Sequence, residues 1–65
     1  MDRIEEVTVE LGCHFAYFSV EQKASDIKAI QLARKETRKW LAEQNIEKKE
    51  IESILRLAEK ALEIV

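Results

Sequence analysis

The sequence predicts one small all-α domain that spans residues 1–65. The chain contains no proline and one glycine, and 46% of its residues are hydrophobic and 37% are charged. This composition is typical of long helices joined by few turns. Apolar residues recur at helical spacing along most of the chain, and the strongest turn signal is Gln44-Asn45. Two helices on either side of this turn are therefore expected.

The clearest helix is predicted at residues 47–65. Its apolar residues recur at intervals of three and four, and together they cover about half of the helix surface. Because one neighbouring helix covers less than that, we expect this helix to contact two neighbours. Glu52 precedes Arg56 by four residues, the order that favours an ion pair within a helix. The stripe consists of Ile51, Ile54, Leu55, Ala58, Leu62 and Val65, widened by Leu57, Ala61 and Ile64.

A second helix is predicted at residues 24–44. Ser25 or Asp26 can accept a hydrogen bond from a free amide of the first turn, and Asn45 tolerates the left-handed conformation that ends many helices. Two helices of nearly equal length with a very short connection form an antiparallel hairpin. The stripe of this helix consists of Ile27, Ile30, Ala33, Thr37, Trp40 and Leu41.

Residues 2–22 allow two interpretations. With a period of two, alternate residues from Val7 to Tyr17 are apolar, as in a strand or β-hairpin. We favour a helix, because Gly12 is flanked by residues that make a poor hairpin turn. In that helix, Gly12 would mark either a close helix contact or a break. The helical stripe consists of Ile4, Val7, Leu11, His14, Phe15 and Phe18.

This N-terminal helix would also have a second apolar side. One small domain cannot easily bury two sides of one helix, so the second side is a candidate contact surface. It consists of Val9, Cys13, Ala16, Tyr17 and Val20.

The charges are unevenly distributed, although the net charge is only −2. Residues 1–22 carry one basic and five acidic residues, whereas residues 23–40 carry six basic and two acidic ones. Arg34, Lys35 and Arg38 have no acidic residue three or four positions away. We expect their partners to be carboxylates of another helix or another chain, such as Glu52 and Glu59, with nucleic-acid phosphates as the alternative.

The sequence shows no catalytic, cofactor-binding or metal-binding motif, so we expect a protein that is not an enzyme and needs no cofactor or metal. Cys13 cannot form a disulfide within the chain, and we expect a small, buried and inert thiol. Adjacent helical residues point about 100° apart, so Cys13 and His14 would not converge on one ligand. The longest apolar run, at residues 15–18, is too short to cross a membrane, and the N-terminus is acidic. The expected location is the cytoplasm.

The function that this pattern favours is protein–protein interaction. A chain of 65 residues buries a small core, so a partner is expected, either a second copy in a homo-oligomer that completes the bundle or another protein. The protein would be an adaptor, an antagonist or a chaperone-like subunit that presents an apolar helical face. The candidate partner-binding residues are Val9, Tyr17, Val20, Arg34, Lys35, Arg38, Trp40, Leu57 and Ile64.

The alternative function is a small helical regulator that binds nucleic acid. Its phosphate contacts would come from the basic patch of Arg34, Lys35, Arg38 and Lys39. The overall acidity of the chain weighs against this alternative, because such proteins usually have a strongly basic face.

Overall fold

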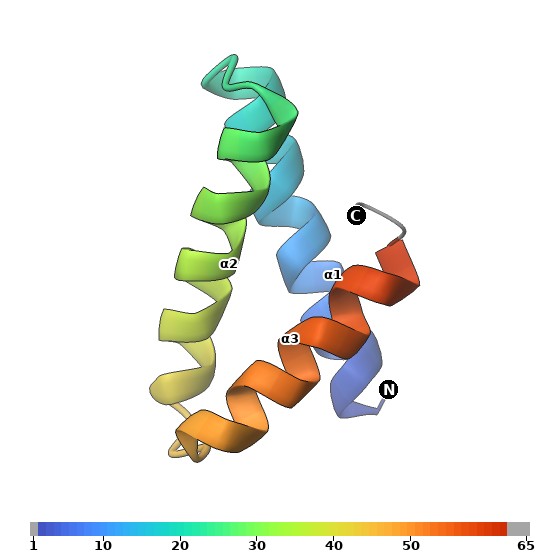
Figure 1. Cartoon of the computed structure of the whole chain (residues 1–65), viewed down its shortest axis with the longest axis vertical. Helices are drawn as coiled ribbons and strands as arrows, with labels where there is room; N and C mark the ends of the chain where they lie inside the picture. Colours follow the sequence, from blue (N-terminus) through green and yellow to red (C-terminus); the bar gives the residue numbers. More distant parts are fainter. Residues whose placement is uncertain (1, 63–65) are drawn as a thin grey trace.

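The computed structural model describes residues 2–62, and this part of the chain is helical (Figure 1). The helices are, in order, α1 (Arg3–Ala16), the short π-helix η1 (Tyr17–Glu21), α2 (Asp26–Ala42) and α3 (Lys48–Leu62). No strand occurs between residues 2 and 62, so the β-hairpin interpretation of the N-terminal segment is wrong and the helical one is confirmed. Of the residues predicted for the last stripe, Ile64 and Val65 lie outside the described residues.

Polar side chains and one left-handed residue set the helix ends. Asp2 Oδ1 accepts a hydrogen bond from the amide of Glu5 at 2.9 Å, and Ser25 Oγ accepts from Lys28 at 3.3 Å. Each bond satisfies an amide that has no partner within its helix. Asn45 adopts a φ of 61° just after α2, as its tolerance of the left-handed region predicts. These residues confirm Ser25 as the cap of α2 and Gln44-Asn45 as the turn.

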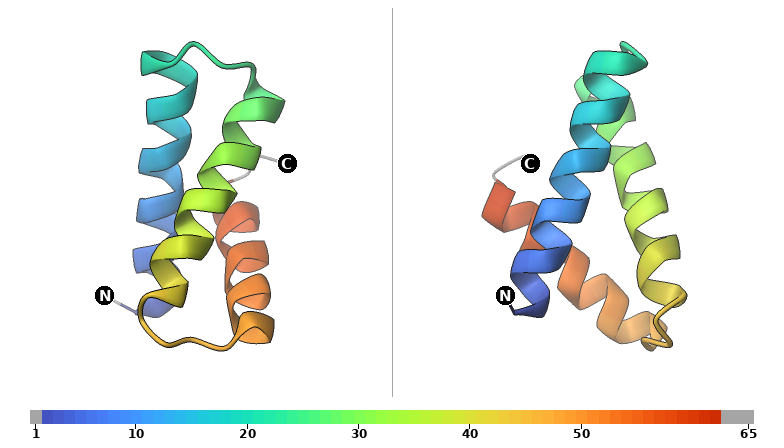
Figure 2. Two further views of the ribbon diagram at one scale, coloured as in Figure 1. Left: turned by 90° about the vertical axis from the view of Figure 1, so that its left-hand side faces the viewer. Right: turned by 180° about the vertical axis from the view of Figure 1, so that it is seen from behind.

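α2 and α3 form the predicted antiparallel hairpin, and α1 packs against both of them (Figure 1). Figure 1 and the right-hand view of Figure 2 show that α3 leans away from α2 with increasing distance from their joint. α1 fills the opening and contacts each helix of the hairpin more extensively than they contact each other. α3 therefore has two neighbours, as its wide stripe predicts. The core cluster consists of Val7, Leu11, Ile30, Ala33, Leu41, Ile51, Ile54, Leu55 and Ala58.

Ile27 is an exception to the predicted stripe of α2, because 73% of its surface is exposed. It lies on the side of α2 that also carries Arg34 and Arg38, whose side chains contact α3. Ile27 belongs to the first turn of α2, and this end of α2 lies away from α3 (Figure 1). The fully buried Ala29 lies in the same turn. The helical period was correct here, but it did not show where the neighbouring helix ends.

Gly12 marks a close helix contact and not a break. α1 continues through it, and a Cβ atom at this position would lie 3.5 Å from Leu62 Cδ2 of α3. The space between α1 and α3 at this position is therefore enough for a small side chain but not for a large one. Among the helices of residues 2–62, none is both long enough and apolar enough to cross a lipid bilayer.

Candidate interaction surface

The side of α1 that points away from the core carries a continuous apolar stripe. Val9 is 54% exposed, Tyr17 48% and Val20 69%. Residues 13 and 16 are also exposed and lie between them at helical spacing. Together with Glu21, the C-terminal part of this surface forms an open groove. We call the set Val9, Cys13, Ala16, Tyr17 and Val20 the α1 stripe. Its exposure agrees with the prediction that one domain cannot bury both sides of this helix.

The ring of Tyr17, toward the C-terminal end of this surface, makes two contacts with neighbouring residues. It meets the ring of Phe18 edge to face, with centroids 5.1 Å apart and an angle of 75° between the planes. Gln22 Nε2 donates a hydrogen bond to Tyr17 Oη at 3.0 Å. Both contacts come from η1 and the residue that follows it. The sequence gives no recognisable signal for this π-helical turn, so the fixed orientation of Tyr17 was not predicted.

Cys13 is exposed, so the expectation of a buried thiol is wrong. It lies on the outer side of α1 between Val9 and Tyr17, where no other helix covers it. The neighbouring His14 turns toward α2, and its Nε2 lies 3.3 Å from Glu10 Oε1. The two side chains therefore point to different sides, as helical geometry predicts. Within residues 2–62, no group of three or more His, Cys, Asp or Glu residues is placed to hold a metal ion.

A second open groove lies between α1 and α2, and we call it the α1–α2 groove. Its lining includes a partly buried tryptophan, Trp40, which also packs against the core cluster. Trp40 therefore takes part in the core, while part of its ring remains accessible from the groove. The lining residues are Glu10, His14, Glu36, Lys39, Trp40 and Glu43.

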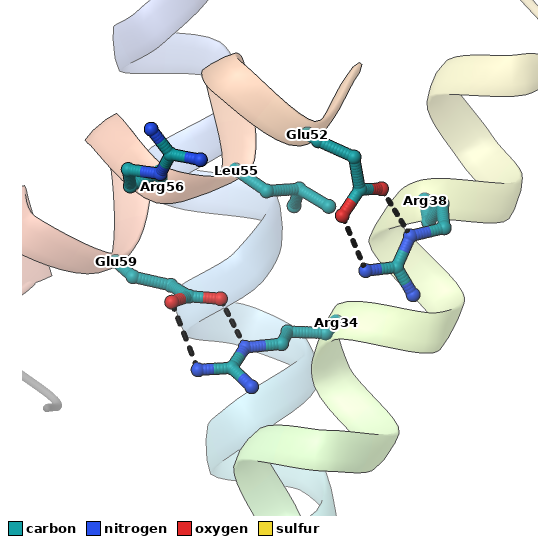
Figure 3. Close-up of a pocket in the computed structure, with 6 residues that line it drawn as sticks. All are labelled: Arg34, Arg38, Glu52, Leu55, Arg56 and Glu59. Carbon is teal, nitrogen blue, oxygen red and sulfur yellow. Dashed lines mark hydrogen bonds and ion pairs between the residues drawn. The ribbon is translucent and has the colours of Figure 1, made fainter. Parts of the chain in front are cut away.

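Arg34 and Arg38 form ion pairs that link α2 to α3 (Figure 3). Arg34 donates through Nε and Nη2 to the two carboxylate oxygens of Glu59, the second bond measuring 2.9 Å. Arg38 donates in the same way to Glu52, at 2.7 and 3.1 Å. Two parallel bonds between a guanidinium and a carboxylate fix both side chains geometrically. The prediction that carboxylates of another helix pair with these arginines is confirmed.

The electrostatics of the second pair follow from its hydrogen bonds. The bonds from Arg38 lower the pKa of the Glu52 carboxyl below its ordinary value of 4.5. Donating these bonds to Glu52 raises the pKa of Arg38 in turn. Glu52 pairs with Arg38 of α2, and the expected ion pair of Glu52 with Arg56 within α3 is not formed. The contact between helices takes precedence over the one within α3.

This pairing divides the predicted basic patch. The guanidinium groups of Arg34 and Arg38 face α3 and are neutralised there, whereas Lys35 and Lys39 are exposed on other sides of α2. The four cations therefore do not form one continuous surface. Leu57, on the outer edge of α3, is 51% exposed, and Ile64 lies outside the described residues.

Comparison of the chain with protein-family models, with curated proteins and with solved structures finds no match.

Proposed function

We propose that this protein is an interaction module without enzymatic activity, which presents the α1 stripe to another protein. The observation that carries the proposal is the continuous exposure of apolar side chains from Val9 to Val20. At 1.5 Å per residue, this surface is about 17 Å long, or roughly three turns of helix. Exposed apolar area of this kind costs free energy in water, which a partner recovers by covering it.

Tyr17 is the expected anchor of this contact. Tyrosine is enriched among the residues that dominate binding energy, because it combines a large ring with a polar end. Its contacts with Phe18 and Gln22 orient the ring before binding, so less side-chain entropy is lost when a partner arrives. The binding mode would be either a helix laid in an apolar groove of the partner or completion of a bundle. An adaptor, an antagonist or a chaperone-like subunit would use such a face.

Self-association is a separate part of the proposal, and we assign it to the outer edge of α3. Leu57 and Ala61 are exposed there, one turn apart. Light scattering after size exclusion tests this assignment. A homo-oligomer that Leu57→Glu dissociates would support it, whereas a stably folded monomer would contradict it.

The main experiment compares the partners of three forms of the tagged protein in cells of its source. The stripe variant is Tyr17→Glu/Val20→Glu, and the control is Ile27→Glu, because Ile27 is as exposed as Val20 but lies outside the stripe. A specific partner should accompany the wild type and the control but not the stripe variant. The purified partner and this protein should then form a complex with fixed stoichiometry. Equal recovery with all three forms would contradict the proposal.

A further inference from the structure

The charged residues that border the α1 stripe are mainly acidic. Asp2 and Glu6 continue the line of the stripe toward the N-terminus, since they precede Val9 at intervals of four and three. Glu5 lies on one side of the stripe, and Glu10 and Glu21 lie on the other. All of these acids except the half-buried Glu10 are exposed. Residues 2–22 contain one arginine and one histidine against these five carboxylates.

The acidic border extends onto α2 on one side. Glu10 lines the α1–α2 groove together with Glu36 and Glu43, and Lys39 is the one basic residue in this lining besides His14. Trp40 forms part of the same groove. An apolar stripe and an acidic groove that contains an aromatic ring therefore lie next to each other and share α1.

These charges decide between the occupants that an apolar helical face can have. If a second copy packed its own stripe onto this one, the contact would bring together two segments that each carry five carboxylates and one arginine. Like charges brought together at a contact are unfavourable, and this repulsion selects against a partner that is itself acidic. An anionic membrane surface and nucleic acid would meet the same repulsion.

We infer that the α1 stripe binds a basic amphipathic segment of another protein. This inference rests on the proposed function and specifies the chemistry of the partner. Apolar residues of the segment would cover the stripe, and its flanking lysines or arginines would meet the carboxylates of the border. An arginine that reaches the α1–α2 groove would find Glu10, Glu36 and the ring of Trp40 in one lining, and carboxylates and aromatic rings both attract a guanidinium. Charge complementarity of this kind accelerates association and makes it depend on salt.

Synthetic amphipathic helical peptides test the inference directly. The first peptide carries leucines on one face and lysines on its flanks, the second has glutamates in place of the lysines, and the third is a scrambled form of the first. Calorimetry at low and high ionic strength measures their binding to the full chain. We expect the lysine peptide alone to bind, with an affinity that falls as salt increases.

Two variants separate the contribution of the charges from that of the stripe. Glu10→Lys/Glu21→Lys should weaken binding of the lysine peptide by at least about tenfold and improve binding of the glutamate peptide. The control, Glu47→Lys/Glu50→Lys, makes the same change of charge at exposed positions before and within the first turn of α3. It should retain the affinity of the wild type. Circular dichroism of each variant verifies that the helices are intact.

The remaining outcomes overturn the inference in distinguishable ways. Equal binding of the lysine and glutamate peptides would keep the stripe as a contact surface, but it would show that the partner is not selected for basic residues. Absence of peptide binding would also overturn it, whereas the proposed function would still be decided by the partner experiment with Tyr17→Glu/Val20→Glu. Self-association that this variant abolishes would assign the stripe to a second copy. Binding of the wild type to anionic vesicles would assign it to a membrane surface.

Discussion

The guanidinium of Arg38 donates two hydrogen bonds to the carboxylate of Glu52, at 2.7 and 3.1 Å, and thereby joins α2 to α3 near their turn. Further along the diverging helices, Arg34 and Glu59 form the second link. Side chains of opposite charge thus tie together a hairpin whose helices make fewer contacts with each other than with α1.

This link predicts a specific dependence of stability on pH. Because the pKa of Glu52 is lowered in the folded protein, its carboxylate stabilises the fold at pH values above 4.5. The contribution is lost as the pH falls below this value and the carboxylate is protonated. Arg38→Gln removes the link, so it should cost stability at pH 7 but little at pH 3. The cost at pH 7 should not exceed about 1 kcal/mol, because both side chains are more than two-fifths exposed.

Urea unfolding of the wild type and of Arg38→Gln across this pH range is the appropriate measurement. Arg56→Gln is the matched control, since Arg56 lies in the same region of the surface without binding Glu52. The free energy of unfolding of the control should differ from that of the wild type by the same amount at every pH. A difference between the wild type and Arg38→Gln that does not change with pH would mean that the pair contributes nothing through ionisation.

The two arginine links should also differ in strength. Glu59 is only 14% exposed, whereas Glu52 is 44% exposed, so solvent screens the Arg34 pair less than the Arg38 pair. Arg34→Glu places two carboxylates together at the less exposed site and should destabilise the fold by about 1–3 kcal/mol. Lys35→Glu, at the neighbouring exposed position, should have a small effect. The charge swap Arg34→Glu/Glu59→Arg should recover part of the loss, and failure to do so would show that packing and not charge explains it.

Gly12 offers a stabilising substitution. Glycine within a helix costs about 1 kcal/mol relative to alanine, and a Cβ atom at this position would make an ordinary van der Waals contact with Leu62. Gly12→Ala should therefore raise the free energy of unfolding by up to about 1 kcal/mol. Gly12→Leu should lower it, because a large side chain would separate α1 from α3. If alanine were as harmful as leucine, α1 and α3 would lie closer together than this structure shows.

Thr37 is fully buried, and its hydroxyl has no hydrogen-bond partner among the described residues. Burial of an unpaired hydroxyl is costly, so Thr37→Val should stabilise the protein by about 1 kcal/mol. Thr8 is the matched control, since its hydroxyl donates to the carbonyl of Ile4 at 2.6 Å. Thermal unfolding should show a gain for Thr37→Val that Thr8→Val does not give. A loss in both variants would indicate that the Thr37 hydroxyl is paired in solution.

The sequence predicted the helices, the turn and the second face of α1, because each of these depends on local periodicity or on one capping residue. It placed Ile27 in the core and Cys13 out of contact with solvent, and both assignments were wrong. The exposure of Ile27 depends on where α3 diverges from α2. That point is set by the angle between the two helices and not by the spacing of residues along one helix. The exposure of Cys13 depends on the other helices covering only one side of α1.

The ion pairs also show the difference between features that depend on local sequence and features that depend on how the helices pack. The absence of acidic residues near Arg34 and Arg38 in sequence correctly indicated partners from another helix. The competition for Glu52 was not visible, because Arg56 is close in sequence and Arg38 is close only in the folded chain. The π-helical turn that orients Tyr17 was not predicted either. The spacing of apolar residues does not distinguish a π-helical turn from the α-helix that precedes it.

The exposed thiol of Cys13 provides a direct measure of whether the α1 stripe is covered. In the free protein it should react with a disulfide reagent without denaturant, at a rate within a few-fold of that in the unfolded chain, because no other helix covers it. Binding of a partner or of the lysine peptide should slow this reaction strongly. The control is Cys13→Ser/Ile27→Cys, which moves the only thiol to an exposed position of α2 outside the stripe, where the same ligand should give no protection. Equal protection at both positions would indicate general association and contradict the stripe as the contact surface. A thiol that is slow to react in the free monomer would mean that Cys13 is covered within the chain itself.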